Sequence, residues 1–244
     1  ETVVFDVPTE FVPNNPLCPI TVDFSKEEEK CFHPQNFDEQ FRGPVSLRRG
    51  LAQSINVPSA KVLYLAGLGD SLQTLHDFGI TTLNEPGRYG LSLVLGGGEV
   101  KLIDLVGAYS VLAQEGIRRP QVMILEIRDS AGRVLESYQD RSERVAEVQY
   151  TRLVSDILSD VSARAGLFQN SLSLTVYPDH EVALKTGTTN DYRDAWAIGY
   201  LPSFVVGVWA GNNDNAPMQR KGSSVLAAVP IWHDFMVEAL RDRP

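Results

Sequence analysis

The sequence has no stretch typical of a membrane span and no recognisable signal peptide. The longest run without a charged residue, 195–213, is interrupted by Pro202 and several glycines, which favours a hairpin over a spanning helix. Residues 1–8 contain neither a basic region nor a long apolar core. We therefore expect any membrane anchor or export signal to lie outside this chain.

Basic charge is scarce, and the common zinc-binding motifs are absent. The formal net charge is −9, which argues against nucleic acid as the main partner, because nucleic-acid-binding surfaces are usually basic. The four histidines are scattered, and no Cys-x-x-Cys or His-Glu-x-x-His spacing occurs. The sequence therefore predicts no zinc site.

Cysteine is rare as well. Only Cys18 and Cys31 are present, and both lie in one loop-like stretch. A disulfide between them would form in an oxidising compartment and would restrict the unfolded chain. Two free thiols are the equal alternative, and the sequence leaves both open.

The pattern of apolar residues changes along the chain. Prolines interrupt the first 45 residues or so, and no regular element is expected there. Helical periodicity and turn residues then predict helices at about 46–53, 59–66, 70–78, 101–114, 151–165 and 227–240, and a β-hairpin at 121–137. Three strand-like runs at 181–188, 194–201 and 204–211 predict an antiparallel meander. Helices, a meander and a closing helix indicate an α+β fold.

The most informative motif is Lys185-Thr186-Gly187-Thr188, on the first predicted strand of the meander. The ammonium can attract an anionic substrate and transfer a proton, and the threonine hydroxyls can hold a carboxylate. Gly187 has no side chain to block a ligand that lies along the strand. A motif this short also occurs by chance, and the plain alternative is an exposed strand that runs into a turn.

A second motif, Ser54-Ile55-Asn56, follows the first predicted helix. Ser-x-Asn is common by chance and on its own indicates only a polar turn. The order of the two motifs is more informative. A Ser-x-Asn in a helical region, about 130 residues before a Lys-Thr-Gly that opens a β-meander, is the layout of the serine acyl-transfer enzymes that bind penicillin.

Longer segments then resemble one family. They are residues 34–38, 41–48, 54–58, 185–191, 194–200, 206–213 and 222–232. These segments are similar to the transpeptidase domain of class A penicillin-binding proteins, and the likeness covers essentially the whole chain. The resemblance implies a serine transpeptidase/β-lactamase-like fold, cross-linking of the D-alanyl-D-alanine stem peptides of peptidoglycan, acylation by β-lactams, and no cofactor or metal. It also implies a periplasmic or extracytoplasmic location.

The resemblance implies roles for single residues. Ser54 would pass a proton between Lys185 and the lysine of a Ser-x-x-Lys motif, whose serine is the nucleophile. Asn56 would position the substrate amide and that same lysine. Thr186 and Thr188 would bind the terminal carboxylate of the stem peptide, and the Thr188 N–H would be one of two oxyanion donors.

The chain departs from the family in one respect, because it contains no Ser-x-x-Lys. The residues three positions before its lysines are Asp23, Glu27, Pro58, Gly98, Val182 and Met218. We therefore expect residues 1–244 to be a partial transpeptidase domain that begins after the nucleophile, lacks the first strands of the sheet, and is inactive alone.

Three functions remain open at this point. The first is a D,D-transpeptidase whose nucleophile lies upstream of this chain. The missing Ser-x-x-Lys motivates a second, a non-catalytic penicillin-binding-like scaffold or sensor. A β-lactamase or D,D-carboxypeptidase on the same fold is the third, and it differs in the acceptor that removes the acyl group.

Overall fold

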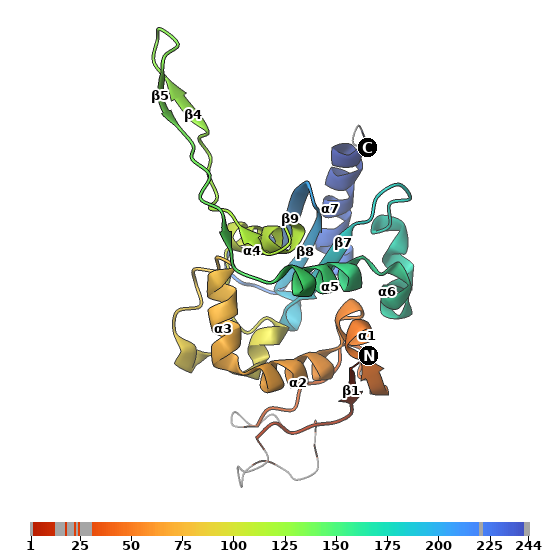
Figure 1. Ribbon diagram of the computed structural model, residues 1–244. Helices are drawn as coiled ribbons and strands as arrows, with labels where there is room; N and C mark the ends of the chain where they lie inside the picture. The colour runs from red at the N-terminus through yellow and green to blue at the C-terminus, as the bar shows by residue number, and fades with distance from the viewer. Residues whose placement is uncertain are drawn as a thin grey trace.

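A three-stranded antiparallel meander lies at the centre of the fold. The structure, a computed structural model, describes residues 2–12, 18, 22, 24, 31–219 and 222–241. Strands β7 (Ala183–Thr188), β8 (Asp194–Leu201) and β9 (Phe204–Gly211) lie in the order β7-β8-β9 (Figure 1). Only Pro202 and Ser203 connect β8 to β9, and so short a connection permits only antiparallel pairing. The predicted meander is confirmed.

Helix α7 (Ser224–Leu240) covers one face of the meander. Its Val229, Trp232 and Met236 are fully buried in a cluster with inward-facing residues of β7 and β8. Burial of side chains of this size stabilises the fold by about 1.5–3 kcal/mol each. Gly199 of β8 makes the close approach possible, because a Cβ there would overlap the Trp232 ring. The predicted closing helix is therefore confirmed.

Helices α4 (Leu102–Ala113) and α5 (Val148–Ser159) also pack against the sheet. Helix α4 packs on β9, and α5 packs on β7. A hydrogen bond of 2.9 Å between the hydroxyls of Ser155 and Tyr200 ties α5 to β8. The meander is therefore covered by helices on two sides, and this arrangement confirms the predicted α+β class.

The single helix predicted over 151–165 is instead two helices. Helix α5 ends at Ser159, and α6 (Val161–Phe168) follows after Asp160. The Asp160 carboxylate accepts a hydrogen bond of 2.8 Å from the Ala163 N–H and caps α6. Aspartate favours such N-cap positions, because its side chain satisfies a backbone donor that the helix leaves unpaired. The apolar periodicity continues across Asp160, so the sequence pattern gave no sign that the helix ends there.

Three further helices pack in sequence order, and the first of them also contacts α5 and α6: α1 (Leu47–Ala52), α2 (Asn56–Ala66) and α3 (Leu68–Asp77). Ser46 caps α1 by accepting a hydrogen bond of 3.2 Å from the Arg49 N–H. Helix α2 begins at Asn56, earlier than predicted, because proline is tolerated in the first turn of a helix. Short 3-10 helices complete the chain: η1 (Pro86–Arg88), η2 (Leu91–Leu95), η3 (Gln169–Leu174) and η4 (Asn190–Tyr192).

Strand β1 (Val3–Asp6) pairs antiparallel with β2 (Gly43–Ser46). The prediction that this part of the chain has no regular element is wrong for these two strands. Each is only four residues long, and β2 itself contains Gly43 and Pro44, so neither shows a periodicity that could be recognised. A disulfide joins Cys18 to Cys31, which decides between the two alternatives left open by the sequence.

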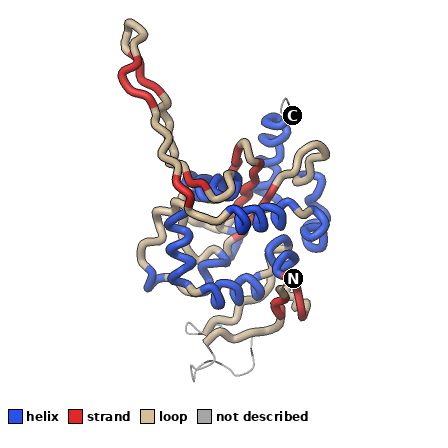
Figure 2. The backbone as a smooth tube through the Cα atoms, viewed as in Figure 1, coloured by secondary structure: helices blue, strands red, loops and turns tan. Residues whose placement is uncertain are grey.

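The predicted hairpin is confirmed by β4 (Glu126–Arg128) and β5 (Val134–Ser137), which project from the body of the protein (Figures 1 and 2). A shorter pair, β3 (Ile117–Arg118) and β6 (Glu143–Arg144), lies at its base. Within the described ranges, no helix is both long enough and apolar enough to cross a membrane.

Candidate active site

Ser54 and Lys185 lie in direct contact although 131 positions separate them. The Lys185 Nζ donates to the Ser54 Oγ at 2.6 Å and to the backbone carbonyl of Thr186 at 2.6 Å. Lys185 is on β7, and Ser54 follows the end of α1. The fold therefore joins the two sequence motifs through a hydroxyl and an amine, the pair of groups that a proton relay requires.

The backbone of Ser54 has an unusual conformation. Its φ is 56°, in the left-handed region that residues other than glycine rarely adopt. Such a conformation costs on the order of 1–3 kcal/mol and persists only where the surroundings hold it. Here the Ser54 N–H donates to the backbone carbonyl of Leu51 at 3.1 Å, and the Ile55 N–H donates to the backbone carbonyl of Gly50 at 2.9 Å. In this backbone conformation the Ser54 hydroxyl contacts Lys185.

Burial changes the acidity of Lys185. It lowers the pKa of Lys185 from the usual 10.5 to about 8, because the charged ammonium loses solvation. With this pKa about half of the amine is neutral at pH 8 and able to accept a proton, and the charged form predominates at lower pH. An amine with a pKa close to the working pH is well suited to take up and return protons.

The other residues of the Lys-Thr-Gly motif alternate between the two faces of β7. Lys185 pairs across the sheet with Ile198, and Thr188 pairs with Ala195. Thr188 lies on the α7 side, where its Oγ1 accepts a hydrogen bond of 2.9 Å from the Ser224 N–H at the start of α7. This bond fixes the hydroxyl oxygen and leaves the hydroxyl hydrogen able to donate to a ligand.

Gly187 has space around it. A Cβ at this position would approach the Trp196 Cβ at 3.6 Å, which is an ordinary contact. The fold therefore does not require a glycine here, in contrast to Gly199. A glycine that packing does not require is consistent with close approach of a ligand to the strand.

A small pocket opens beside β7 where these groups meet. In the part of the chain that the structure describes, no strand pairs with the second edge of β7. The pocket is lined by Ala52, Ser54, Arg164, Phe168, Ser171, Thr175, Leu184, Lys185, Thr186, Val225 and Val229. A peptide could lie along an unpaired strand edge of this kind and use its backbone donors and acceptors.

Arg164 was not predicted as a site residue, yet it lines this pocket. It is only 5% exposed, and its guanidinium donates to the carbonyls of Leu158 at 3.5 Å and Thr175 at 3.3 Å. Its Nε has no hydrogen-bond partner among the described residues. The signal was present in the sequence, because Arg164 continues the apolar stripe that runs through Leu158 and Val161 at helical spacing.

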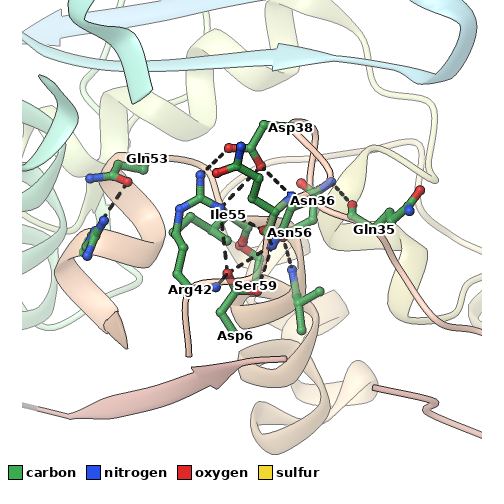
Figure 3. Close-up of polar contacts among 12 residues, drawn as sticks. Asp6, Gln35, Asn36, Asp38, Arg42, Gln53, Ile55, Asn56 and Ser59 are labelled. Atoms are coloured by element: carbon green, nitrogen blue, oxygen red, sulfur yellow. Dashed lines mark hydrogen bonds and ion pairs between the residues drawn. The ribbon is translucent and has the colours of Figure 1, made fainter. Parts of the chain in front are cut away.

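Asn56 makes a hydrogen bond to the loop before β2. Its Nδ2 donates to the Gln35 carbonyl at 2.7 Å (Figure 3). The structure therefore brings Ser54 and Lys185 together and places Asn56 two residues further along, at the start of α2. The second N–H and the Oδ1 of its amide can still bind a ligand.

A buried polar network holds the loop that Asn56 contacts. The Asn36 Nδ2 donates to both carboxylate oxygens of Asp6, at 2.8 and 3.0 Å, and the Asn36 Oδ1 accepts from the Val57 N–H at 3.2 Å. Asp6 also accepts from the Arg42 N–H at 3.0 Å (Figure 3). Asp6 is fully buried. The network fixes the first turn of α2, and thereby the position of Asn56.

Three potential metal ligands lie close together among the described residues. Glu10, Cys18 and Cys31 bring their donor atoms within 4.8 Å of one another. The two sulfurs are joined in a disulfide, and metal binding by cysteine uses the thiolate. The cluster in this oxidised form therefore does not supply the donor set of a metal site.

Comparisons with known proteins identify a family for this chain. A family model described as "Penicillin binding protein transpeptidase domain" matches residues 21–236. The chain is 35% identical over 222 residues to "Penicillin-binding protein 1A" of Aquifex aeolicus, an alignment that covers 91% of this chain. The chain spans only 29% of the length of that relative.

Two solved structures share the fold. Penicillin-binding protein 1A from Haemophilus influenzae matches with a TM-score of 0.80 and 22% identity, over 99% of this chain and 39% of that chain. PonA1 from Mycobacterium tuberculosis in complex with penicillin V matches with a TM-score of 0.74 and 22% identity, over 87% of this chain and 61% of that chain. These likenesses confirm the predicted serine transpeptidase fold.

Proposed function

The chain belongs to the penicillin-binding protein transpeptidase domain family, and from this premise we propose that the whole protein is a serine D,D-transpeptidase. It cross-links the stem peptides of peptidoglycan and is acylated by β-lactams. The observation that carries the proposal is the 2.6 Å contact between the Lys185 Nζ and the Ser54 Oγ. Residues 1–244 supply one part of the transpeptidase domain in this proposal.

The reaction consists of two acyl transfers. A serine nucleophile, supplied by a Ser-x-x-Lys motif upstream of this chain, attacks the carbonyl between the two D-alanines of the donor. The bond to the terminal D-alanine breaks, and the leaving amine takes up a proton. An amine of a second stem peptide then attacks the acyl-enzyme ester, the serine oxygen leaves and regains its proton, and the cross-link forms.

Ser54 and Lys185 relay protons in this scheme. Ser54 receives the proton of the nucleophile through the upstream lysine and delivers it to the leaving amine. Lys185 donates a hydrogen bond to the Ser54 Oγ, which orients the hydroxyl and stabilises negative charge on it. The lowered pKa of Lys185, about 8, supports this role, because proton exchange is efficient when the pKa lies near the working pH.

The remaining motif residues hold the donor. Thr186 and Thr188 bind its terminal carboxylate, and Gly187 lets the donor lie close to β7. The Thr188 N–H stabilises the oxyanion of the tetrahedral intermediate. Asn56 binds the donor amide through the hydrogen-bonding groups that its bond to Gln35 leaves available.

The site of action in this proposal is the periplasm or the extracytoplasmic face of the membrane, where peptidoglycan is assembled. The disulfide between Cys18 and Cys31 supports this location, because disulfides persist in oxidising compartments.

Covalent labelling of the whole protein by a fluorescent penicillin tests the proposal. The wild type should be labelled, Lys185→Ala should lose labelling, and Lys101→Ala should keep it. Lys101 is a matched control, because it is an exposed lysine that lies before α4. Labelling that survives Lys185→Ala would remove Lys185 from the mechanism, and absence of labelling in the wild type would contradict the assigned activity.

The absence of Ser-x-x-Lys from this sequence favours one alternative, a non-catalytic penicillin-binding-like scaffold or sensor. A whole protein that binds stem peptides but is never acylated would support it. A β-lactamase or D,D-carboxypeptidase would instead hydrolyse the acyl-enzyme. A stem peptide offered together with an amine acceptor separates these cases, since only a transpeptidase gives the cross-linked product.

A further inference from the structure

Helix α1 ends in a turn that has a serine where glycine is usual. The Ile55 N–H donates to the Gly50 carbonyl and the Ser54 N–H to the Leu51 carbonyl, which is the hydrogen-bond pattern of a Schellman motif. The left-handed position of this motif is usually occupied by glycine and sometimes by asparagine. Here it is occupied by Ser54, with a φ of 56°. A serine holds this conformation less readily than a glycine does, so the surroundings must support the turn.

The side chain of Gln53 gives such support. Gln53 comes directly before Ser54 and is only 4% exposed. Its Nε2 donates a hydrogen bond of 2.9 Å to the backbone carbonyl of Ala163, in helix α6. Its backbone N–H donates to the Arg49 carbonyl of α1 at 3.0 Å. One residue therefore connects the end of α1, the turn of Ser54 and helix α6.

Helix α6 leaves room for the amide of Gln53. Ala163 and Gly166 are three positions apart and therefore lie on the same side of this helix. A Cβ at Gly166 would lie 2.5 Å from the Gln53 Nε2 and 3.1 Å from its Cδ. Atoms overlap at such distances, so the amide fits only because Gly166 has no side chain. Packing this close restricts the orientation of Gln53.

The two groups of the proposed proton relay are held in different ways. Lys185 belongs to β7, which pairs with β8 over its whole length, and the Lys185 Nζ also donates to the Thr186 carbonyl. Ser54 lies outside any helix or strand, so the turn alone sets the position of its hydroxyl. The contact between the two groups is 2.6 Å. Misplacement of a reacting group by about 1 Å can slow an enzyme about a hundredfold.

We propose that Gln53 is a positioning residue for acyl transfer. Its hydrogen bond to α6 holds the turn so that the Ser54 hydroxyl stays within hydrogen-bond distance of Lys185. Gly166 shares this role, because it admits the Gln53 amide. The inference rests on the proposed function, in which Ser54 and Lys185 relay protons. It adds two residues that lie outside the Ser-x-Asn and Lys-Thr-Gly motifs.

Acylation of the whole protein by benzylpenicillin tests this role. Gln53→Met keeps a side chain of similar length and removes the amide donor. It should lower the limiting acylation rate by about tenfold or more, because a displaced hydroxyl is rarely in the reactive geometry. The dissociation constant of the preceding non-covalent complex should change less than about twofold, since Thr186 and Thr188 bind the ligand carboxylate in the proposed function. An unchanged limiting rate would overturn the proposal.

Gln121→Met is the matched control. The Gln121 Nε2 donates a hydrogen bond of 2.6 Å to the Ile103 carbonyl of α4, and a Cβ at Gly107 of that helix would overlap the Gln121 amide. The chain thus repeats the contact between a glutamine amide and a helical glycine, on the segment between β3 and β4 instead of beside Ser54. This variant should keep the wild-type rate. Equal losses at the two glutamines would overturn the role of Gln53.

Gly166→Ala changes the same contact from the side of α6. The added methyl overlaps the Gln53 amide, so this variant should slow acylation as Gln53→Met does. Alanine favours a helix more than glycine does, so the loss would not come from weaker helix formation. Gly107→Ala is its control and should leave the rate unchanged. A Gly166→Ala protein that reacts at the wild-type rate would contradict the proposal.

A double-mutant cycle with Ser54→Ala separates positioning from general support of the fold. If Gln53 acts through the Ser54 hydroxyl, Gln53→Met should slow a Ser54→Ala protein by less than about twofold. A loss as large as in the wild-type background would show that Gln53 acts in another way and would overturn the proposal. Thermal unfolding shows whether each variant is folded. If Gln53→Met is not folded, Gly166→Ala takes its place in the cycle.

Failure of the proposed function would give a different result. A wild-type protein that benzylpenicillin never acylates would contradict the function, and crystal structures of the variants would then decide the inference. Displacement of the Ser54 hydroxyl from Lys185 in Gln53→Met, but not in Gln121→Met, supports the positioning role. A contact that keeps its hydrogen-bond length in both variants overturns it.

Discussion

The Asn36 side chain bonds to both carboxylate oxygens of Asp6, at 2.8 and 3.0 Å, in the interior of the protein. The Asn36 Oδ1 also accepts a hydrogen bond from the Val57 N–H near the start of α2. One amide therefore connects strand β1, the loop of residues 35–42 and the helix that carries Asn56.

This connection predicts that Asn36→Ala destabilises the protein strongly. The substitution leaves the buried oxygens of Asp6 and the Val57 N–H with fewer partners, and each buried polar group left without its hydrogen bond costs about 1–3 kcal/mol. Urea unfolding measures the change. Asn84→Ala is a suitable control, because Asn84 is an exposed asparagine whose bond to Thr81 is local; its effect should stay below about 1 kcal/mol. Similar losses in the two variants would contradict the role of the network.

Alanine substitutions at Gly199 and Gly187 distinguish a glycine that core packing requires from one that leaves space for a ligand. Gly199→Ala should destabilise the fold by about 1–3 kcal/mol, because the added methyl overlaps the Trp232 ring. Gly187→Ala should leave the midpoint of thermal unfolding nearly unchanged, since its methyl finds ordinary contact distances. It should still slow acylation by benzylpenicillin, because the methyl occupies space beside β7. A Gly187→Ala protein acylated at the wild-type rate would contradict close approach of the ligand.

The lowered pKa of Lys185 predicts a pH dependence of stability. Burial lowers this pKa from 10.5 to about 8, so the unfolded chain binds the proton more tightly than the folded protein does. Below pH 8 both states are protonated, and the folded state bears the full cost of burying the charge. As the pH rises from about 8 toward 10.5, the folded protein loses its proton first, and its stability increases.

Urea unfolding at pH 7.5 and 9.5 checks this sign by comparison with Lys185→Met. The wild type should gain stability relative to the variant at the higher pH, by roughly 1–3 kcal/mol. A constant difference between the two proteins would show that the amine is not buried in its charged form.

Thr188 is predicted to stabilise the start of α7 as well as to bind substrate. Thr188→Val removes the acceptor of the Ser224 N–H and should cost about 1 kcal/mol, whereas Thr188→Ser retains the hydroxyl and should cost less. Both variants can be compared by thermal unfolding. Equal stability of the valine and serine variants would contradict the capping role.

Much of this architecture was predictable from local patterns. The meander, α7 and α4 follow from alternation or helical spacing, because each buries one face of a regular element. The break at Asp160 was missed, since the apolar stripe continues across it. The pairing of β1 with β2 was also missed, because it depends on a partner that is distant in the sequence.

The candidate site divides in the same way. Motif spacing pointed to Ser54 and Lys185, and the structure brings them together. The motif spacing could not reveal that Asn56 donates a hydrogen bond to Gln35 or that Thr188 caps α7, because these contacts depend on tertiary packing.

The coupling between Ser54 and Lys185 is the central claim, and a double-mutant cycle on the acylation rate of the whole protein measures it most directly. Ser54→Ala and Lys185→Ala should each lower the second-order rate with benzylpenicillin by at least about a hundredfold. If the two residues act as one relay, the double variant will be about as slow as the slower single variant. Losses that multiply in the double variant would show two independent residues and would contradict the account.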